Sequence, residues 1–263
     1  MATREELRGR FDEDAERYDR ARPGYPSALV DDLVELTGAP HEVLEVGCGT
    51  GQLTVPLAER GCRITAVDLG TGMAAAARRK LAEFPGVHVH VGAFEAVPLA
   101  ADYFDAVVSA TAFHWVDPEV RLHRAADALR PGGALALVTT DHVNGGTEDF
   151  FIEVQECYLR WDEDTPPGLR LPHANDVMAT PMLAPDQPGR SRFGRQATRS
   201  YTVDISYTAG EYIDTLLTYS GHRAMRPGNQ AGLLDCIATL IDKHYGGGVV
   251  KRYLNRLYVA ATL

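Results

Sequence analysis

The sequence predicts an α/β fold with a doubly wound, mostly parallel sheet and an appended α/β cap. From residue 42, apolar segments of strand length alternate with segments of helical pattern, and such alternation requires crossovers that leave the strands parallel. The first apolar segment, Val43–Val46, runs directly into glycines at 47, 49 and 51, which in such a sheet form the turn that opens the ligand crevice. The alternation stops after residue 141, so the remaining residues are expected to form the cap.

The first two helices are expected before the sheet begins. The apolar stripe of the first helix consists of Leu7, Phe11, Ala15 and Tyr18. This helix is expected to end before Pro23 and Pro26, because proline cannot continue a helix. The second helix is expected to start with Ser27 as its cap and to stop near Gly38.

The later elements follow from apolar runs and helix signals. The strands expected in the alternating part are 43–46, 63–67, 87–91, 104–109 and 134–139. The clearest helix start between them is Asp117-Pro118-Glu119, which offers an N-cap, a proline at the first helical position and an acid that the helix dipole favours. Beyond residue 141 we expect helices over 150–161, 211–219 and 231–245, strands over 201–207 and 249–259, and a long loop over 162–190.

Composition excludes several classes of protein. The chain has 263 residues, of which 45% are hydrophobic and 24% charged, as in ordinary packed domains. Its formal net charge of -10 repels phosphate backbones and anionic lipids, so neither nucleic acid nor a membrane is expected as a partner. The N-terminal residues are charged where a signal peptide is apolar, and the longest clean apolar run, Ala134–Val138, is too short to cross a bilayer.

The cysteines point to a reducing compartment. They are Cys48, Cys62, Cys157 and Cys236. Their wide spacing and the lack of a C-x-x-C pair argue against a zinc site and against a disulfide framework of the secreted kind. We therefore expect a cytoplasmic protein without a metal site. As oligomeric state we expect either a monomer or a homodimer.

The strand-to-helix turn at Gly47, Gly49 and Gly51 is the strongest signal for a ligand site. Glycines there permit a tight turn and let the backbone approach a ligand closely. A nicotinamide-binding turn looks similar, but its third glycine stands at the sixth position of the motif, where this chain has Gln52. An acid, Glu45, also lies inside the strand two residues before the first glycine. Both features argue against a nicotinamide-dependent dehydrogenase.

Asp68 ends the second expected strand, one crossover after the glycine turn. A carboxylate at this edge of the sheet can accept hydrogen bonds from both hydroxyls of a ribose, which nucleotide-derived cofactors require. The alternative is a helix cap or turn residue without a ligand role.

Taken in order, these motifs resemble the class I S-adenosylmethionine-dependent methyltransferases over about residues 10–140. The matching segments are Glu45–Gly51, Asp68, Met73, Gly92–Glu95, Phe104–Val108, Phe113–Trp115 and Leu129–Gly133. The chain looks most similar to the small-molecule methyltransferases of the ubiquinone-biosynthesis and trans-aconitate type. The resemblance implies a Rossmann-like core, S-adenosylmethionine as cofactor and methyl transfer to a small molecule. It also implies lid helices over 1–40, a cofactor-binding core over 41–141, a substrate cap over 142–248 and a final strand over 249–263 that completes the sheet.

The resemblance also implies roles for single residues of the cofactor site. Glu45 and the backbone of the glycine turn would hold the methionine end, and Asp68 would accept the ribose hydroxyls. Met73 and Phe94 would contact the adenine. Many relatives carry an aspartate just before this phenylalanine, where this chain has Ala93, so stacking, backbone groups or Glu95 would have to hold the adenine amino group.

The segment 18–23 resembles the lid of the family. Tyr18 and Arg22 could close over the cofactor, with the guanidinium of Arg22 pairing the methionine carboxylate. The alternative is that Tyr18 only completes the apolar stripe of its helix and Arg22 is a solvated charge.

Residues for the acceptor side are expected where strands or helices end. His114 follows the fourth strand and is a candidate general base, or else a residue that packs near the sulfonium. Asp141 and His142 follow the fifth strand. His142 is the second catalytic candidate and Asp141 a candidate for substrate binding, and the alternative for both is to cap the next turn. Tyr219 and His222 end a helix and could face the substrate or complement the helix dipole. The chain lacks the Asn/Asp-Pro-Pro-aromatic motif, which argues against methylation of DNA bases or glutamine.

Two further functions remain open at this stage. One is a non-methylating use of the sulfonium, an intramolecular cyclisation that releases methylthioadenosine, because no acceptor motif can be identified. The other is a nonenzymatic binding module on the same fold, although the intact glycine turn and Asp68 count against it.

Overall fold

The computed structural model describes residue 12 and residues 14–263. The expected helix positions Leu7 and Phe11 lie outside these residues. The described chain divides into two compact units, each with residues from separate parts of the sequence. Unit 1 comprises residues up to 22, 141–180 and 202–254, and unit 2 comprises 23–140, 181–201 and 255–263.

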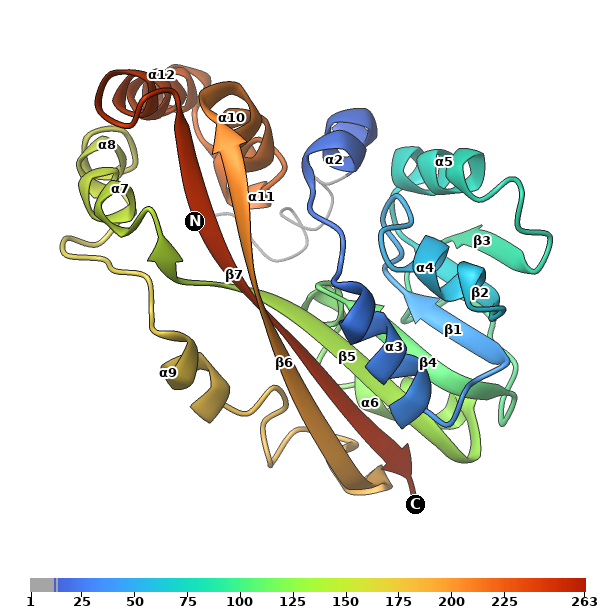
Figure 1. Cartoon of the computed structure of the whole chain (residues 1–263). Helices are drawn as coiled ribbons and strands as arrows, with labels where there is room; N and C mark the ends of the chain where they lie inside the picture. Colours follow the sequence, from blue (N-terminus) through green and yellow to red (C-terminus); the bar gives the residue numbers. More distant parts are fainter. Residues whose placement is uncertain (1–11, 13) are drawn as a thin grey trace. The chain divides into compact units, whose positions relative to one another are not determined.

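Unit 2 contains most of a seven-stranded sheet in the order β3-β2-β1-β4-β5-β7-β6 (Figure 1). The strands are β1 (Glu42–Val46), β2 (Arg63–Asp68), β3 (Val87–Val91), β4 (Phe104–Ala110), β5 (Leu129–Gly146), β6 (Phe193–Thr208) and β7 (Gly248–Thr262). The pairs β1–β2, β1–β4, β2–β3 and β4–β5 are parallel, while the arrow of β7 points opposite to those of β5 and β6 (Figure 1). This confirms the predicted α/β class and the mostly parallel, Rossmann-like sheet. The strand order reverses between β1 and β4, and open α/β sheets bind ligands at such a switch point.

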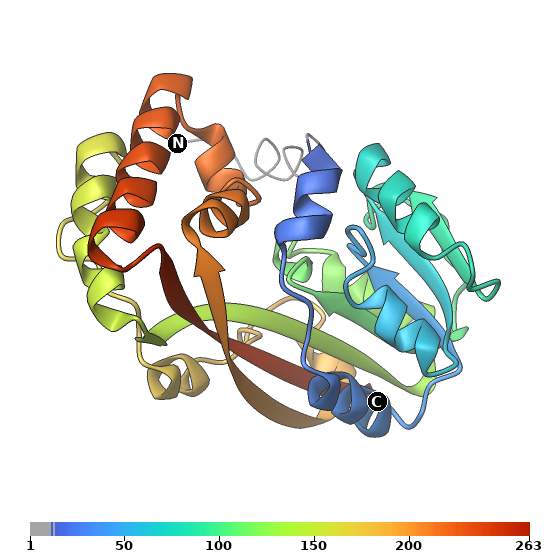
Figure 2. The same ribbon diagram turned by 45° about the horizontal axis from the view of Figure 1, so that its top comes forward.

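Helices cover both faces of the sheet in unit 2. Apolar side chains of α3 (Ser27–Leu36), α4 (Thr54–Glu59) and α5 (Thr71–Lys80) pack in one core on one face. A second core, on the other face, includes α6 (Arg121–Ala128) and Phe94. Figure 2 shows α3, α4 and α5 together on one side of the strands. β1 and β4 are buried almost throughout because they lie between these two layers.

Unit 1 is built mainly from helices. They are α2 (Ala15–Ala21), α7 (Glu148–Glu153), α8 (Gln155–Trp161), α9 (Ala174–Ala179), α10 (Ala209–Leu216), α11 (Ser220–Ala224) and α12 (Pro227–His244). Their core is formed around the fully buried Phe150, Leu233, Ile237 and Ile241. α10 begins with a capping box, in which Thr208 and Glu211 satisfy each other's free backbone N–H groups.

Several helix boundaries differ from the sequence predictions. Asp117 does not cap a helix at 118; its carboxylate accepts the N–H of Glu119 at 3.0 Å and forms a turn, so α6 starts at Arg121. Pro26 rather than Ser27 is the N-cap of α3, and the Ser27 hydroxyl bonds Asp31 instead. The expected helix 150–161 is two helices, α7 and α8, and the expected loop 162–190 contains α9.

Two strands are much longer than their apolar runs suggested. β5 continues to Gly146 and β6 begins at Phe193. The additional residues of β5 alternate in burial, with Val143 and Gly145 buried, so their strand character depends on pairing with neighbouring strands rather than on a hydrophobic run. The predicted division into lid, core, cap and final strand stays a prediction, since each of β5, β6 and β7 contributes residues to both units.

A disulfide bond joins two cysteines that the sequence analysis expected to stay unpaired. Cys157 of α8 and Cys236 of α12 are 79 residues apart, yet their Cα atoms are 5.8 Å apart. The expectation was wrong for this pair because spacing along the chain does not reveal that α8 and α12 pack together. Cys48 and Cys62 are free and buried. In the described part of the chain, none of the helices combines the length and the hydrophobicity needed to cross a membrane.

Candidate functional site

The glycine turn after β1 requires glycine for both its backbone angles and its space. Gly47, Gly49 and Gly51 have φ values of +73°, +58° and +96°, which L-residues with a side chain rarely adopt. A Cβ atom at Gly47 would lie 2.3 Å from the Cβ of Ala112, so no larger residue fits there. The same contact places the segment after β4 directly beside the turn. The turn is therefore a bare backbone surface at the carboxyl ends of the parallel strands.

Asp68 holds this turn in place. Its two carboxylate oxygens accept hydrogen bonds from the backbone N–H groups of Gly49 and Gly70, both at 2.8 Å. Asp68 therefore acts as a turn residue, which was the alternative to a ligand role. An ionised carboxylate can accept about four hydrogen bonds, so these two contacts do not preclude the ribose role, which stays a prediction.

Glu45 is buried directly behind the glycine turn. Its side chain belongs to β1 and the residue is only 1% exposed, and its Oε2 atom has no hydrogen-bond partner among the described residues. Burial raises the pKa of Glu45 to about 8; Thr54 acts to lower it, and the negative charge of Asp68 raises it further. The carboxyl group is therefore mostly protonated at neutral pH. A cationic amine bound at this place would favour the ionised carboxylate and give the buried oxygen a partner of opposite charge.

The residues expected to contact adenine lie in well-packed positions. Met73 is buried in α5, and Phe94 is buried in the second core with the Arg124 guanidinium over its ring at 5.6 Å. Glu95 accepts the backbone N–H of Asp117 at 3.1 Å and so fixes the turn before α6. Contact of these side chains with a nucleoside stays a prediction.

His114 lies on a short 3₁₀ helix, Phe113–Trp115, that follows β4. The residue is exposed, and its ring packs against Trp115 with centroids 4.9 Å apart. Partial burial of the ring and the positive charge of Arg121 lower the pKa of His114. The imidazole is therefore neutral at physiological pH and able to accept a proton.

The other predicted site residues lie together in unit 1. The guanidinium of Arg22 stacks on the rings of Tyr219, at 4.3 Å, and Tyr18, at 5.1 Å. The Tyr219 hydroxyl forms a 3.1 Å hydrogen bond with Nε2 of His142, and the rings of Tyr219 and His222 are 5.9 Å apart. Residues predicted separately for a lid and for the acceptor therefore form one cluster. Asp141 precedes His142 in β5 and is half-buried.

This cluster is extended by residues that were not singled out from the sequence. The Tyr158 hydroxyl and Nε2 of His222 form a 2.9 Å hydrogen bond, and the ring of Tyr253 packs against His142 at 5.4 Å. Lys251 was missed altogether. It is 4% exposed and occupies an inward-facing position of β7, between the buried Val249 and Tyr253. A lysine in register with inward-facing apolar residues was the available sequence signal.

The electrostatics of the cluster keep both histidines neutral. Burial lowers the pKa of His142 to about 3, and the positive charges of Lys251 and Arg22 contribute in the same direction. Burial lowers the pKa of His222 to about 4, an effect that Asp162 opposes and Lys251 reinforces. Positive charge from two side chains thus converges on His142.

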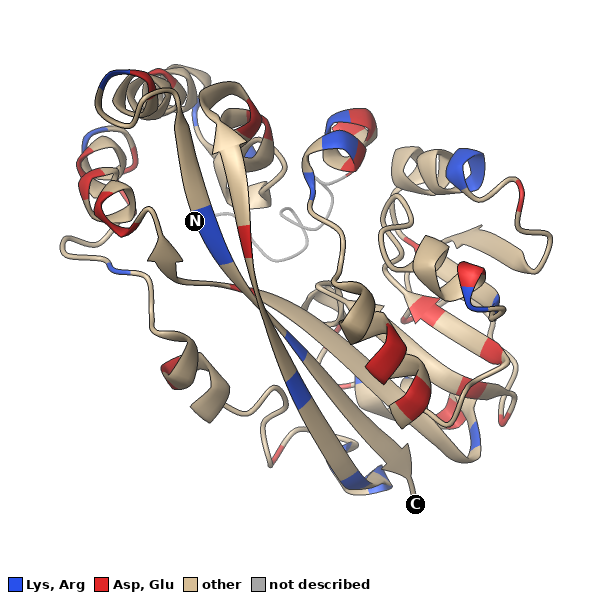
Figure 3. Ribbon diagram, viewed as in Figure 1, with Lys and Arg blue, Asp and Glu red and all other residues tan. Residues whose placement is uncertain are grey.

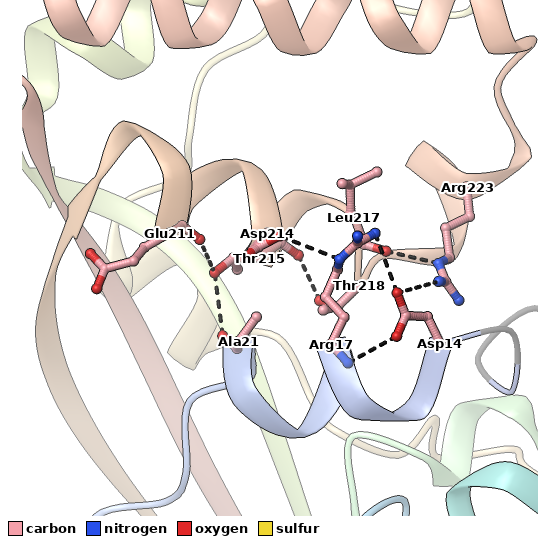
Figure 4. A network of polar contacts seen from close by, with 9 residues as sticks. All are labelled: Asp14, Arg17, Ala21, Glu211, Asp214, Thr215, Leu217, Thr218 and Arg223. Atoms are coloured by element: carbon pink, nitrogen blue, oxygen red, sulfur yellow. Dashed lines mark hydrogen bonds and ion pairs between the residues drawn. The ribbon is translucent and has the colours of Figure 1, made fainter.

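A polar network holds α2 and therefore Tyr18 and Arg22 in place (Figure 4). Arg17 of α2 pairs with Asp214 of α10 at 3.3 Å, and Arg223 of α11 pairs with Asp14 at 3.9 Å. The Thr215 hydroxyl donates to the carbonyl of Ala21 at 3.3 Å. Because these contacts join α2 to α10 and α11, the cation of Arg22 is fixed over Tyr219 rather than solvated.

Comparison with known proteins identifies a family for the segment that contains the glycine turn. Residues 44–137 match the family described as "Methyltransferase domain". The chain contains a class I, S-adenosylmethionine-dependent methyltransferase domain. This confirms the class I resemblance found in the sequence, while the small-molecule subtype stays a prediction. S-adenosylmethionine is the cofactor that the family implies.

The relatives differ in how much of the chain they cover. An uncharacterized methyltransferase of Mycobacterium tuberculosis is 43% identical over 121 residues, 46% of this chain and 48% of that protein. A malonyl-[acyl-carrier protein] O-methyltransferase of Acetivibrio thermocellus is 28% identical over 82% of this chain and 78% of its own length. The chain thus spans about half the length of the first of these relatives.

The fold is shared with solved structures over nearly the whole chain. A candidate type II methyltransferase from Anaeromyxobacter dehalogenans superposes with a TM-score of 0.64 and 24% identity, and the match covers 92% of this chain and 97% of that one. The methyltransferase domain and the elements added to it therefore both occur in that fold.

Proposed function

We propose that the protein transfers a methyl group from S-adenosylmethionine to a small-molecule acceptor. The observation that carries this proposal is the bare glycine turn with the unpartnered Oε2 of Glu45 behind it, in a methyltransferase domain. A buried polar atom without a partner costs about 1–3 kcal/mol. The ammonium group of the methionine moiety is a ligand group whose charge would remove that cost.

The proposed cofactor contacts follow the geometry of unit 2. Backbone groups of the glycine turn and Glu45 would hold the methionine end, Asp68 the ribose, and Met73, Phe94 and Glu95 the adenine. When bound, the cofactor supplies a methyl group on a positively charged sulfur, ready for in-line displacement. The protein's own task is to align the acceptor with that methyl group and to exclude water.

An acceptor that must lose a proton needs a base, and the two candidate histidines differ in fitness for this role. His142 is a weak base because its pKa is held at about 3. His114 is exposed on the segment that follows β4, so we assign it the role of base. Replacement of His114 by Ala is expected to lower turnover more than cofactor affinity.

The acceptor side is proposed to involve Asp141, His142, Tyr219 and His222, with Tyr18 and Arg22 as the lid. We propose a monomer or homodimer as the active form and the cytoplasm as its location. The Cys157–Cys236 disulfide counts against the cytoplasm, since disulfides persist mainly in oxidising compartments.

The proposal is tested by titration calorimetry with S-adenosylhomocysteine on the full chain. Asp68→Ala is expected to weaken binding more than tenfold, from loss of charge-assisted hydrogen bonds worth about 1.5–3 kcal/mol. Asp127→Asn, at an exposed acid of α6, is the matched control and should bind like the wild type.

A second ligand separates the ribose role of Asp68 from its hold on the turn. S-adenosylhomocysteine without its 2′-hydroxyl should bind the wild type more weakly, whereas Asp68→Ala should bind both ligands alike, because the shared interaction is already lost. Equal binding of both ligands by the wild type would show that Asp68 only holds the turn. No binding of either ligand, or methylthioadenosine as product instead of S-adenosylhomocysteine, would contradict the proposed methyl transfer.

A further inference from the structure

The side chain of Lys251 is buried without a counter-ion among the described residues. Its ammonium group lies over three aromatic rings, those of Phe151 at 4.7 Å, Tyr212 at 5.7 Å and Tyr253 at 5.8 Å. The hydrogen bonds and ion pairs of the described chain include none to its Nζ atom. Aromatic faces attract a cation only modestly, and a buried charge normally has an ionic partner.

The next residue of β7, Arg252, is a cation that has an ionic partner. Arg252 forms two 2.6 Å contacts with the carboxylate of Asp204 on β6. Figure 3 shows basic residues in the first half of β7. β7 therefore directs Arg252 to an exposed ion pair and Lys251 into the aromatic interior, where burial is the cause of its lowered pKa and no acid contributes.

A second cation in the same cluster is also incompletely satisfied. Among the described residues, the guanidinium of Arg22 donates one hydrogen bond, to the carbonyl of Thr218 at 3.3 Å, and its Nε atom is buried without a partner. Arg22 and Lys251 both act on His142, which lies against Tyr219 and Tyr253. Two unpaired cations therefore face one neutral histidine and two tyrosine hydroxyls, which can donate hydrogen bonds.

We propose that Arg22, His142, Tyr219, Lys251 and Tyr253, here called the Lys251 cluster, bind the carboxylate group of a small molecule. Only the identification of that molecule with the methyl acceptor rests on the proposed function. Net charge does not explain the site, because the chain as a whole is acidic. A carboxylate, with a single charge on two coplanar oxygens, matches the separate side-chain donors and an aromatic lining. Phosphate groups are usually met by several backbone N–H groups at a turn or helix start, and the cluster offers side chains instead.

The experiment measures binding of malonate, benzoate and inorganic phosphate to the full chain by titration calorimetry at constant chloride, near pH 7. The wild type should bind at least one of the two carboxylates in preference to phosphate. Lys251→Met, which keeps the length of the side chain, should lower that affinity at least about tenfold. Lys243→Met is the matched control, because Lys243 is exposed on α12, and Lys251→Arg should retain measurable binding because it keeps the charge.

A pH series with the wild type gives a readout that does not depend on a variant. Carboxylate affinity should fall between about pH 7 and pH 9.5, as Lys251 loses its proton. Around it, the pKa values of His142 and His222 lie near 3 and 4, and burial raises those of Tyr212, Tyr219 and Tyr253. These neighbours therefore keep their charge over the same range.

Four results of the carboxylate titrations would each overturn the proposal: absence of carboxylate binding by the wild type, preference for phosphate, unchanged binding by Lys251→Met, or affinity independent of pH. Binding of S-adenosylhomocysteine is measured on the same samples. If Lys251→Met weakened it as much as carboxylate binding, the cluster would belong to the cofactor site and the proposal would fail. If the wild type bound carboxylate but not S-adenosylhomocysteine, the proposed function would fail and the carboxylate site would stand.

Discussion

Replacement of Lys251 by Met is expected to stabilise the protein at neutral pH, because it removes a buried charge that has no ionic partner. Burial lowers the pKa of Lys251 from 10.5 to about 8. Each pKa unit corresponds to about 1.4 kcal/mol, so the folded state is about 3 kcal/mol less stable wherever the lysine is charged in both states. Methionine is neutral and similar in length, so Lys251→Met should be more stable than the wild type by this amount.

The effect has a defined pH dependence. Below about pH 8 both states bind the proton and the full cost is present; between about pH 8 and 10.5 the folded state has released the proton and the unfolded state has not. Wild-type stability from this group therefore rises with pH, and the advantage of Lys251→Met should shrink by about 2 kcal/mol between pH 7 and 9.5.

The assay is urea unfolding at these two pH values, followed by fluorescence of Trp161, which lies in unit 1, in a Trp115→Phe background. Lys243→Met in the same background controls for loss of an exposed charge and should change stability by less than about 0.5 kcal/mol. A variant at position 251 that is less stable than the wild type, or an advantage that does not change with pH, would refute the claim that the ammonium group is buried without compensation.

Three further predictions concern other buried groups. The pKa values of His142 and His222, about 3 and 4, lie below those of the unfolded chain. The free energy of unfolding should therefore fall by about 1.4 kcal/mol per pH unit for each histidine as pH drops below about 6.5. Urea unfolding at several pH values should show a smaller dependence of this free energy on pH in the double variant His142→Gln/His222→Gln. Because the pKa of Glu45 is raised to about 8, binding of S-adenosylhomocysteine should release protons near pH 7 as its ammonium group favours the carboxylate; calorimetry in buffers of different ionisation enthalpy should detect this, and Glu45→Gln should abolish it. Cys236→Ser should destabilise the chain by up to about 4.5 kcal/mol, the loop entropy for a separation of 79 residues; Cys62→Ser is the control, and equal urea midpoints with and without reductant would contradict a role for the disulfide.

The cofactor side of the site was accessible from the sequence because its signals are local. The positive φ of Gly47 demands glycine, and Asp68 lies at the end of its strand, where a turn must follow. Such requirements act within one or two turns of the chain, so spacing reveals them. The apolar runs of β1 and β4 were visible for the same reason, since strands buried on both faces have few polar residues.

Other features depended on contacts between distant segments. The helix 150–161 could not be divided into α7 and α8 by its pattern, and nothing local marked Cys157 and Cys236 as partners. The pattern of β7 contained Lys251, but a lysine in a strand is usually solvated. Only the packing of Phe151, Tyr212 and Tyr253 around it makes that position interior.

From residue order alone, this chain specifies an alternating α/β architecture and a glycine turn backed by acids, because backbone angles and short-range hydrophobic patterns are properties of neighbours in sequence. The meeting of Arg22, His142, Tyr219 and Lys251 has a different origin. These residues are supplied by the end of α2, by β5, by the segment before α11 and by β7, and their charges and protonation states are set by mutual burial. That burial exists only once the separate segments have packed.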